Sequence, residues 1–174
     1  GPLHGLANQE CFKYIQGVYN EFGHVPNQDE VTEYLRKTIE SGQVIPGYGH
    51  AVLRSIDPRF AIEYKFAKTT IPDDPYYQTV NAIFKVAPEF LKATGKVKNP
   101  WPNVDGLTGV LFNAFGLTHS SFYTVLFGLS RLLGFTAHIV WARAINKPIE
   151  RPKALTTRIL EAMVTEDTME NLIR

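Results

Sequence analysis

The points at which helices can begin constrain the fold of this sequence more than any other feature. Asp57-Pro58 and Asp74-Pro75 each place a capping carboxylate before a proline, whose fixed φ and missing N–H suit the first position of a helix. Asn27 is followed three residues later by Glu30, which is the spacing of a capping box. Helices are therefore expected to begin after these three caps.

Apolar residues recur at helical spacing in two segments near these caps, and a glycine follows each segment where its helix is expected to end. The first of these helical segments ends at Gly23 and the second at Gly42. The first comprises Cys11, Phe12, Ile15, Val18, Tyr19 and Phe22, and the second comprises Val31, Leu35 and Ile39. Pro88 is expected to break the helix that begins near Pro75, because proline lacks the N–H and its ring clashes with the preceding turn.

The second half of the chain carries three further helical segments. The pattern predicts a helix from Asp105 to about Phe115, a long apolar helix over roughly Ser120–Ile145, and a short terminal helix. The remaining segments are a Pro/Trp-rich loop, an extended link and one stretch with strand-like backbone, at Lys98–Asn103, Pro148–Pro152 and Gln43–Leu53. The fold class is therefore expected to be all-α, with little or no sheet.

Composition limits the function more than it defines it. The net charge of +1 argues against nucleic-acid binding, which usually requires a strong basic stripe. The single cysteine, Cys11, excludes an internal disulfide framework, and its apolar helical face favours a buried hydrophobe over a nucleophile. Ser121–Ala142 is apolar enough to raise the question of a membrane span, but Arg131 and His138 interrupt it. A buried helix of a larger α-helical protein, with no membrane partner, is the better interpretation.

Three short segments each centre on one ionisable residue. They are GPLHGLAN around His4, PGYGHAVLRSIDPR around His50, and NPWPNVDGLTG around Asp105. Each places its His or Asp in a Gly/Pro-rich loop or at the start of a helix, where a rigid scaffold can aim a side chain into a cleft. Two imidazoles and one carboxylate suit general acid/base work on a carbonyl substrate. Because His4 lies almost at the N-terminus, the chain is expected to be part of a larger protein.

Each of these residues also has a structural interpretation when it is considered alone. Taken alone, each is better explained structurally: His4 as a histidine that caps a helix, His50 as part of an ordinary Gly-rich turn, and Asp105 as an N-cap. A histidine beside a helix N-terminus is favoured in its neutral form, which can donate a hydrogen bond to a developing enolate. The PGYGH loop has the composition of a loop that presents backbone N–H groups to a ligand.

The arginines provide a second signal. Arg54 and Arg59 follow His50, Arg131 interrupts an apolar helix, and Arg151 lies between two prolines. No Asp or Glu lies within a helical turn of Arg131, so its partner comes from elsewhere in the fold or is a ligand. No metal-binding pattern, phosphate-binding glycine motif or nucleophile elbow is present in the sequence, so no metal or bound cofactor is expected.

Five motifs, in the order in which they occur along the chain, resemble those of a known family. GPLHGLAN, PGYGHAVLR with DPR, NPWPNVD, YTVLFGLSR and PIERPK are similar to the C-terminal half of citrate synthases of the eukaryotic mitochondrial type. The resemblance covers nearly the whole chain. It implies an all-α homodimer in the mitochondrial matrix, in which residues 1–116 form the small domain and residues 117–174 return to the large domain. The earlier helices of the large domain would be missing.

The resemblance also implies a reaction and a role for each motif residue. The reaction is a Claisen-type condensation of acetyl-CoA with oxaloacetate, followed by thioester hydrolysis to citrate and CoA. Asp105 matches the general base, His4 the residue that hydrogen-bonds the enolate oxygen, and His50 the residue that polarises the oxaloacetate carbonyl. The substrate-binding matches are Arg59, Arg131, Phe127 and, from the partner subunit, Arg151. The coenzyme A contacts match Pro46, Gly47, Tyr48, Gly49, Ala51 and Arg54.

Two departures from the family pattern leave alternatives open. Gly106-Leu107-Thr108-Gly109 follows Asp105 where typical members carry Ala or Ser, then His-Ser-Gly, and a leucine there could reshape the acyl pocket. A methylcitrate or alkylcitrate synthase that uses propionyl-CoA or a longer acyl-CoA is therefore the first alternative. The missing N-terminal half supports a second alternative, a non-catalytic small-domain fragment or interaction module. We expect the chain alone to be inactive and prone to self-association.

Overall fold

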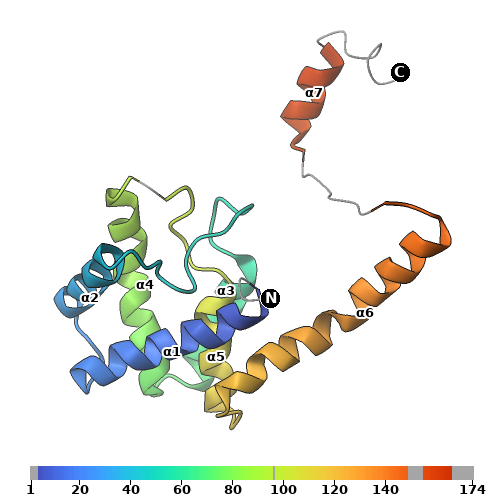
Figure 1. The fold of residues 1–174 in the computed structure, drawn as a ribbon. Coiled ribbons are helices and arrows are strands. Elements are labelled where there is room, and N and C mark those ends of the chain that lie inside the picture. Colours follow the sequence, from blue (N-terminus) through green and yellow to red (C-terminus); the bar gives the residue numbers. More distant parts are fainter. Residues whose placement is uncertain (1–3, 96, 149–154, 166–174) are drawn as a thin grey trace. The chain divides into compact units, whose positions relative to one another are not determined.

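The structure is a computed structural model that describes residues 4–95, 97–148 and 155–165 (Figure 1). Its helices are α1 (Gly5–Phe22), α2 (Gln28–Glu40), α3 (Pro58–Thr70), α4 (Pro75–Ala93), α5 (Asp105–Ala114), the 3₁₀ turn η1 (Ser120–Phe122), α6 (Tyr123–Ala144) and α7 (Thr157–Thr165). Within the described residues there is no strand, and the expected strand-like stretch contributes only an isolated bridge between Tyr48 and Pro102. The all-α prediction is confirmed.

The predicted caps form as the sequence indicates. Asn27 accepts hydrogen bonds from the N–H groups of Asp29 and Glu30, and the Glu30 carboxylate accepts the N–H of Asn27, which completes the capping box. Asp57 and Asp74 cap the two helices that begin with proline. Gly23 ends α1 in the left-handed conformation, at φ 69°. Local sequence therefore sets the starts of three of the helices.

The prediction that Pro88 breaks its helix is wrong, because α4 continues through it to Ala93. Pro88 is itself buried, and so are Ile83, Ala87 and Leu91 on the same helix. A proline inside a helix costs about 3 kcal/mol. Burial of several apolar side chains, each contributing about 1.5–3 kcal/mol, exceeds that cost and keeps the helix continuous.

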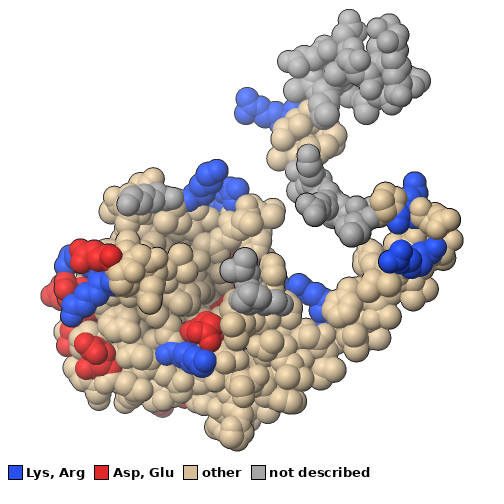
Figure 2. All heavy atoms as spheres, in the orientation of Figure 1, with Lys and Arg blue, Asp and Glu red and all other residues tan. Residues whose placement is uncertain are grey.

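Two clusters of buried side chains form the core between α1 and α5. The first joins α1, α3, α4 and α5 and is closed by Tyr123; its members are Cys11, Phe12, Ile15, Phe60, Ala67, Tyr77, Val80, Leu107, Val110 and Tyr123. The second joins α1, α2 and α4 through Val18, Val31, Leu35, Ile45, Ile83, Ala87 and Leu91. Cys11 is buried as expected, and burial raises the pKa of its thiol. Charged side chains gather instead over α2 (Figure 2).

The long helix α6 is exposed in this chain, and the burial expected for it concerns a larger protein and stays a prediction. Of its side chains only Tyr123 is buried, and large apolar side chains such as Leu133 and Trp141 are 83% and 67% exposed. The helical segment Ser120–Ala144 is long and apolar enough to cross a membrane by length and composition, a weak criterion that core helices of soluble proteins also meet. Within the described residues, the chain therefore leaves this apolar helix uncovered.

The chain separates into two compact units, Gly1–Arg131 and Leu132–Arg174. The first contains both core clusters and all three ionisable residues singled out from the sequence. The expected division between residues 1–116 and 117–174 concerns the domains of a whole protein and stays a prediction. Everything described below for the candidate site lies within the first unit.

Candidate active site

The PGYGH loop lies directly against the start of α5. Gly47 has φ 78°, and a Cβ atom there would lie 2.7 Å from Cys11 Sγ and 2.8 Å from Gly106 Cα. These separations are too short for any side chain, so backbone meets backbone at this point. The close approach brings the loop that carries His50 onto the turn of helix that begins with Asp105.

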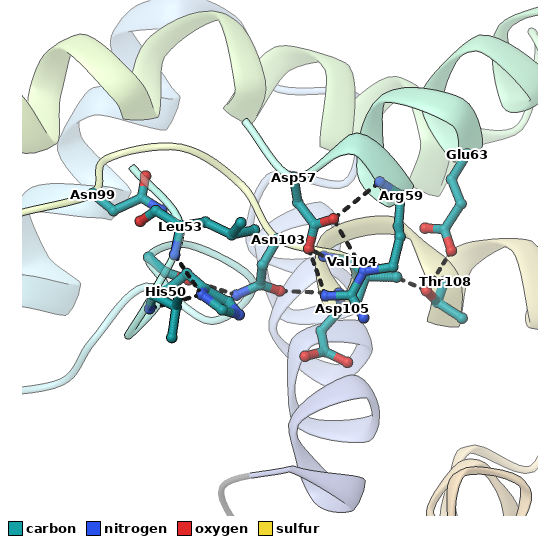
Figure 3. Close-up of polar contacts among 12 residues, drawn as sticks. His50, Leu53, Asp57, Arg59, Glu63, Asn99, Asn103, Val104, Asp105 and Thr108 are labelled. Atoms are coloured by element: carbon teal, nitrogen blue, oxygen red, sulfur yellow. Dashed lines mark hydrogen bonds and ion pairs between the residues drawn. The ribbon is translucent and has the colours of Figure 1, made fainter. Parts of the chain in front are cut away.

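Asn103 joins this loop to α5 by three hydrogen bonds. Its N–H donates to the Gly47 carbonyl at 2.9 Å, and its side-chain Nδ2 donates to the Gly49 carbonyl at 2.9 Å. Its Oδ1 accepts the N–H of Asp105 at 3.0 Å. Figure 3 shows Asn103 between His50 and Asp105. One amide side chain therefore fixes the loop and the first residue of α5 together.

Two buried polar side chains, those of Asn99 and Asp57, complete this junction. Asn99 is 3% exposed; its Nδ2 donates to the Leu53 carbonyl at 2.9 Å, and its Oδ1 accepts the N–H of Trp101 at 3.0 Å. Asp57 is 1% exposed and accepts the N–H of Val104 at 3.2 Å, so the cap of α3 also holds the start of α5. Buried polar groups of this kind are costly unless they are paired, and here each has partners.

The hydrogen bonds of His50 define its tautomer. Its Nδ1 lies 3.0 Å from the N–H of Val52 and 2.9 Å from the N–H of Leu53, so it accepts from both. A nitrogen that accepts two N–H groups cannot itself carry a proton, and the hydrogen of the ring is therefore on Nε2. The side chain is exposed. The loop thus holds a neutral imidazole whose outer nitrogen is a hydrogen-bond donor.

Asp105 is the first residue of α5, not its N-cap; the cap position is Val104. Its side chain is half-buried, and burial raises the pKa of its carboxyl. The Arg59 guanidinium and His4 lower that pKa, and Asp57 raises it. A carboxylate at a helix N-terminus has the positive end of the helix dipole beside it. The carboxyl therefore lies among charged groups and has an increased affinity for protons, as a general base requires.

His4 immediately precedes α1 and is exposed, with its carbonyl accepting the N–H of Ala7 at 3.1 Å. The next residue, Gly5, is buried against α6: its carbonyl accepts the Thr124 hydroxyl at 3.1 Å. A Cβ atom on Gly5 would lie 3.3 Å from the ring of Phe127. His4 acts electrostatically on Asp105, so the structure brings two of the three predicted residues into one neighbourhood and joins the third to it through Asn103.

Arg59 has an acidic partner two residues earlier, Asp57. Its Nε and one terminal nitrogen donate to the two carboxylate oxygens of Asp57, at 3.0 and 2.8 Å. This fork holds the pKa of Asp57 below its usual range. The Arg59 side chain nevertheless remains 56% exposed, so its remaining N–H groups face outward. The signal that sequence reasoning missed was the Asp two residues earlier, which was interpreted only as a cap.

The other arginines differ from one another. Arg131 is exposed and lies over the ring of Phe127, with 4.4 Å between the guanidinium carbon and the ring centroid. In the described part of the chain no carboxylate pairs with Arg131. Arg54 turns back onto its own loop and donates to backbone carbonyls, at 2.8 Å for Leu53. Arg151 lies outside the described residues.

The proposed coenzyme A contacts lie together on the loop, but several of its amides are already used. The N–H of Tyr48 donates to the Ile45 carbonyl, and that of Gly49 to the Trp101 carbonyl. Further along the loop, the N–H groups of Val52 and Leu53 donate to His50 Nδ1. The loop therefore uses four N–H groups to maintain its own shape, and those four are not free to meet a ligand.

Comparison with known proteins now gives the family. Residues 1–153 match the family described as citrate synthase, C-terminal domain. This match covers most of the chain. The chain belongs to the citrate synthase family. The motif resemblance noted in the sequence is thereby confirmed.

Individual citrate synthases are similar over nearly the whole chain. The probable mitochondrial citrate synthase of Glossina morsitans morsitans is 52% identical over 164 residues, which is 94% of this chain and 35% of that protein. The mitochondrial enzymes of Daucus carota and Xiphias gladius are 51% and 46% identical over 92% and 94% of the chain. The chain spans about a third of the length of these relatives.

Solved structures agree with this assignment. The crystal structure of citrate synthase from Thermotoga maritima matches with a TM-score of 0.68 at 25% identity, over 90% of this chain and 40% of that one. Citryl-CoA lyase from Hydrogenobacter thermophilus matches with a TM-score of 0.60 at 20% identity, over 92% of this chain and 63% of that one, which shows the fold alone.

Leu107, the departure from the citrate synthase pattern next to Asp105, does not face the candidate site. Its side chain is fully buried in the first core cluster, among residues of α1 and α3. Gly106 is also buried, and a Cβ atom there would lie 3.2 Å from the ring of Phe60. These two positions therefore serve helix packing, and the reason given for a reshaped acyl pocket is not supported.

Several residues of the junction escaped the sequence analysis. Asn99, Asn103 and Asp57 make their decisive contacts with residues 46 to 54 positions away. The adjacent Glu63 and Thr108 pair across 45 residues. The only local signal was that both asparagines lie in the Pro/Trp-rich loop. Among the residues that the structure describes, no group of three or more His, Cys, Asp or Glu could hold a metal ion.

Proposed function

We propose that this chain supplies the C-terminal part of an enzyme that condenses acetyl-CoA with oxaloacetate and hydrolyses the thioester product to citrate and CoA. Membership of the citrate synthase family supports the reaction class. The observation that carries the proposal is the junction at Asn103, which connects a neutral imidazole, that of His50, to a half-buried carboxylate, that of Asp105.

Asp105 is proposed as the base that removes a proton from the methyl group of the acetyl thioester. That proton is only weakly acidic, so a carboxylate can remove it only if the enolate is stabilised as it forms. His4 is proposed to hydrogen-bond the enolate oxygen. A neutral imidazole can do this by donating one hydrogen bond without losing its proton.

His50 is proposed to act on the other reactant. Its Nε2–H is the outward-facing donor of the neutral ring and suits the carbonyl oxygen of oxaloacetate. As the new carbon–carbon bond forms, that oxygen gains negative charge, which the hydrogen bond from Nε2–H stabilises. The two acidic carboxylates of the substrate are proposed to meet Arg59, Arg131 and the partner subunit's Arg151, with Phe127 lining the site.

Coenzyme A is proposed to bind along Pro46, Gly47, Tyr48, Gly49, Ala51 and Arg54. Hydrogen bonds within the fold already use the N–H groups of Tyr48 and Gly49 and the carbonyls of Gly47 and Gly49, so the contacts with coenzyme A are proposed to use other groups of the loop. The homodimer and the mitochondrial matrix are also proposals; the names of several relatives include the word mitochondrial. A second acyl substrate is not favoured, because Leu107 is buried.

A chimera tests this proposal. The chain replaces the homologous C-terminal segment of the Daucus carota enzyme, to which it is 51% identical, and release of CoA from acetyl-CoA and oxaloacetate is measured. We expect activity in the chimera, little or none in the chain alone, and a loss of about 10²–10⁴-fold in the chimera carrying Asp105→Asn. A folded, dimeric chimera with no activity, or with a preference for propionyl- or hexanoyl-CoA, would contradict the proposal.

A further inference from the structure

A second carboxyl group, that of Glu63, lies behind Asp105 in a position that the proposed reaction does not use. Glu63 is on α3, one turn beyond Arg59, and its side chain reaches Thr108 on α5 (Figure 3). The Thr108 hydroxyl oxygen is 2.9 Å from Glu63 Oε1 and 2.7 Å from the Val104 carbonyl oxygen. Thr108 is one turn after Asp105, so this contact supports the same turn of helix.

One hydroxyl hydrogen cannot be donated to both oxygens. The Val104 carbonyl can only accept, and it lies four residues before Thr108, the usual partner of a helical threonine hydroxyl. The Thr108 hydrogen is therefore directed to Val104. The contact between Thr108 and Glu63 Oε1 then requires a hydrogen on Glu63. A protonated Glu63 satisfies both distances, whereas an ionised Glu63 leaves two acceptors without a hydrogen between them.

The other carboxyl oxygen of Glu63 gives an independent indication of the same state. Oε2 is buried and has no hydrogen-bond partner within the described residues. An ionised oxygen without partners in such a place is costly, and the carbonyl oxygen of a neutral acid is much less so. Both oxygens of Glu63 are therefore better explained by a neutral acid than by a carboxylate.

The surrounding charges favour the same protonation state. The pKa of Glu63 is raised to about 7; burial is the largest cause, and the negative charges of Asp105 and Asp57 act in the same direction. The Thr108 hydroxyl and the positive charge of Arg59 act in the opposite direction. Arg59 and the cap residue Asp57 belong to α3, the helix that carries Glu63, and Asp105 and Thr108 belong to α5, which the Glu63 side chain contacts.

We propose that Glu63 holds a proton in the working site and is a positioning residue for Asp105, donating as a neutral acid to Thr108 in the first turn of α5. Its catalytic part rests on the proposed function. When Glu63 ionises, its hydrogen bond to Thr108 is lost and a negative charge appears behind the base. Condensation builds negative charge on the enolate oxygen, so the ionised state slows the reaction.

The protonation of Glu63 is tested on the 174-residue chain itself by ¹³C NMR of the side-chain carboxyl carbons as a function of pH. The Glu63 signal is identified by its absence in Glu63→Gln, and the exposed Glu40, identified in the same way with Glu40→Gln, is the control. We expect the Glu63 signal to titrate with a midpoint near 7. A midpoint for Glu63 that coincides with that of Glu40 overturns the proposal.

The positioning role is tested by the pH profile of the chimera. The variant Glu63→Gln presents an amide N–H to Thr108 at every pH, as the neutral acid does at low pH. In the unmodified chimera we expect the rate to fall roughly tenfold as Glu63 ionises, and in Glu63→Gln this alkaline fall should be absent. An unchanged alkaline limb in an active Glu63→Gln chimera overturns the role. If no chimera is active, the proposed function fails, and the NMR titration still decides the protonation.

Discussion

Asn103 Oδ1 accepts the N–H of Asp105 at 3.0 Å, so the orientation of the proposed base depends on an amide side chain two residues earlier. The same amide donates to the Gly49 carbonyl at 2.9 Å, on the loop that carries His50. A single residue thus couples two proposed catalytic groups that come from different parts of the sequence. This coupling makes Asn103 the first residue to test.

Asn103→Ala removes both side-chain hydrogen bonds and leaves the half-buried Gly49 carbonyl and Asp105 N–H without these partners. We expect the free energy of unfolding, measured with urea, to fall by about 2 kcal/mol. In the chimera the same variant should lower the rate of condensation. The control is Asn20→Ala, at an exposed asparagine on α1. If both variants unfold at the same urea concentration, the Asn103 junction does not contribute to stability.

The Gly47 position offers a matched pair of glycines. Gly47 and Gly42 both have φ 78°, but only Gly47 lies against other atoms, with Cys11 Sγ 2.7 Å from the site of a Cβ atom. Gly42→Ala should therefore report the cost of backbone conformation alone, about 1–2 kcal/mol. Gly47→Ala should cost a further 1–3 kcal/mol or so from overpacking. Equal melting temperatures for the two variants would contradict the close approach of loop and helix.

Two substitutions at His50 separate support of the loop from chemistry. His50→Asn keeps an acceptor near the position of Nδ1, so the N–H groups of Val52 and Leu53 remain paired, but it loses the outer donor. We expect near-normal stability and a loss of condensation rate of at least about 100-fold in the chimera. His50→Gln keeps an outer donor and loses the acceptor. It should therefore destabilise the loop, seen as faster amide exchange at Val52 and Leu53.

Asp57 should make stability depend on pH in the acid range. Because its pKa is lowered in the folded protein from the ordinary value of 3.8, it contributes stability above 3.8 that is lost as pH falls through the lower value. At neutral pH, Asp57→Asn should therefore cost about 2–3 kcal/mol in urea unfolding, and the difference should shrink at acid pH. A difference that is constant with pH would show that Asp57 acts only through packing.

The exposed apolar side chains of α6 should cause the isolated chain to self-associate. Leu133 and Trp141 are 83% and 67% exposed, and large uncovered apolar surfaces favour association. Sedimentation velocity should show species larger than the 19.6 kDa monomer, with the distribution moving to monomer in Leu133→Lys and Trp141→Lys. Lys65→Ala, at an exposed residue on α3, should leave the distribution unchanged. A monomeric unmodified chain would refute this expectation.

Local sequence signals predicted most of the helices, but they placed the end of α4 too early, at Pro88. The capping box at Asn27 and the Asp-Pro pairs act within a single turn, so neighbouring residues are enough to recognise them. Pro88 also gives a local signal, but the burial of α4 outweighs it, and burial depends on the whole fold. Sequence therefore predicts where these helices start better than how far they continue.

In the candidate site too, residues in local motifs were predictable from the sequence, and residues that act through long-range contacts were not. His4, His50 and Asp105 were recognisable because each stands in a distinctive motif. The roles of Asn99, Asn103 and Glu63 were not, because their hydrogen bonds join segments more than 40 residues apart. The position of Leu107 was misjudged for a similar reason: being next to Asp105 in sequence does not decide which face of α5 a side chain occupies.

The long-range hydrogen bonds of the junction also have a consequence for the order of folding. Asn99 to Leu53, Asn103 to Gly49 and Val104 to Asp57 all close the same loop, which contains α3 and α4. Closing a long loop costs conformational entropy, whereas a helix forms from local contacts without this cost. These three hydrogen bonds are therefore expected to form after the helices. The helices can therefore assemble on the pathway before the base and the imidazole meet, and substitutions at Asn103 should accelerate unfolding far more than they slow folding.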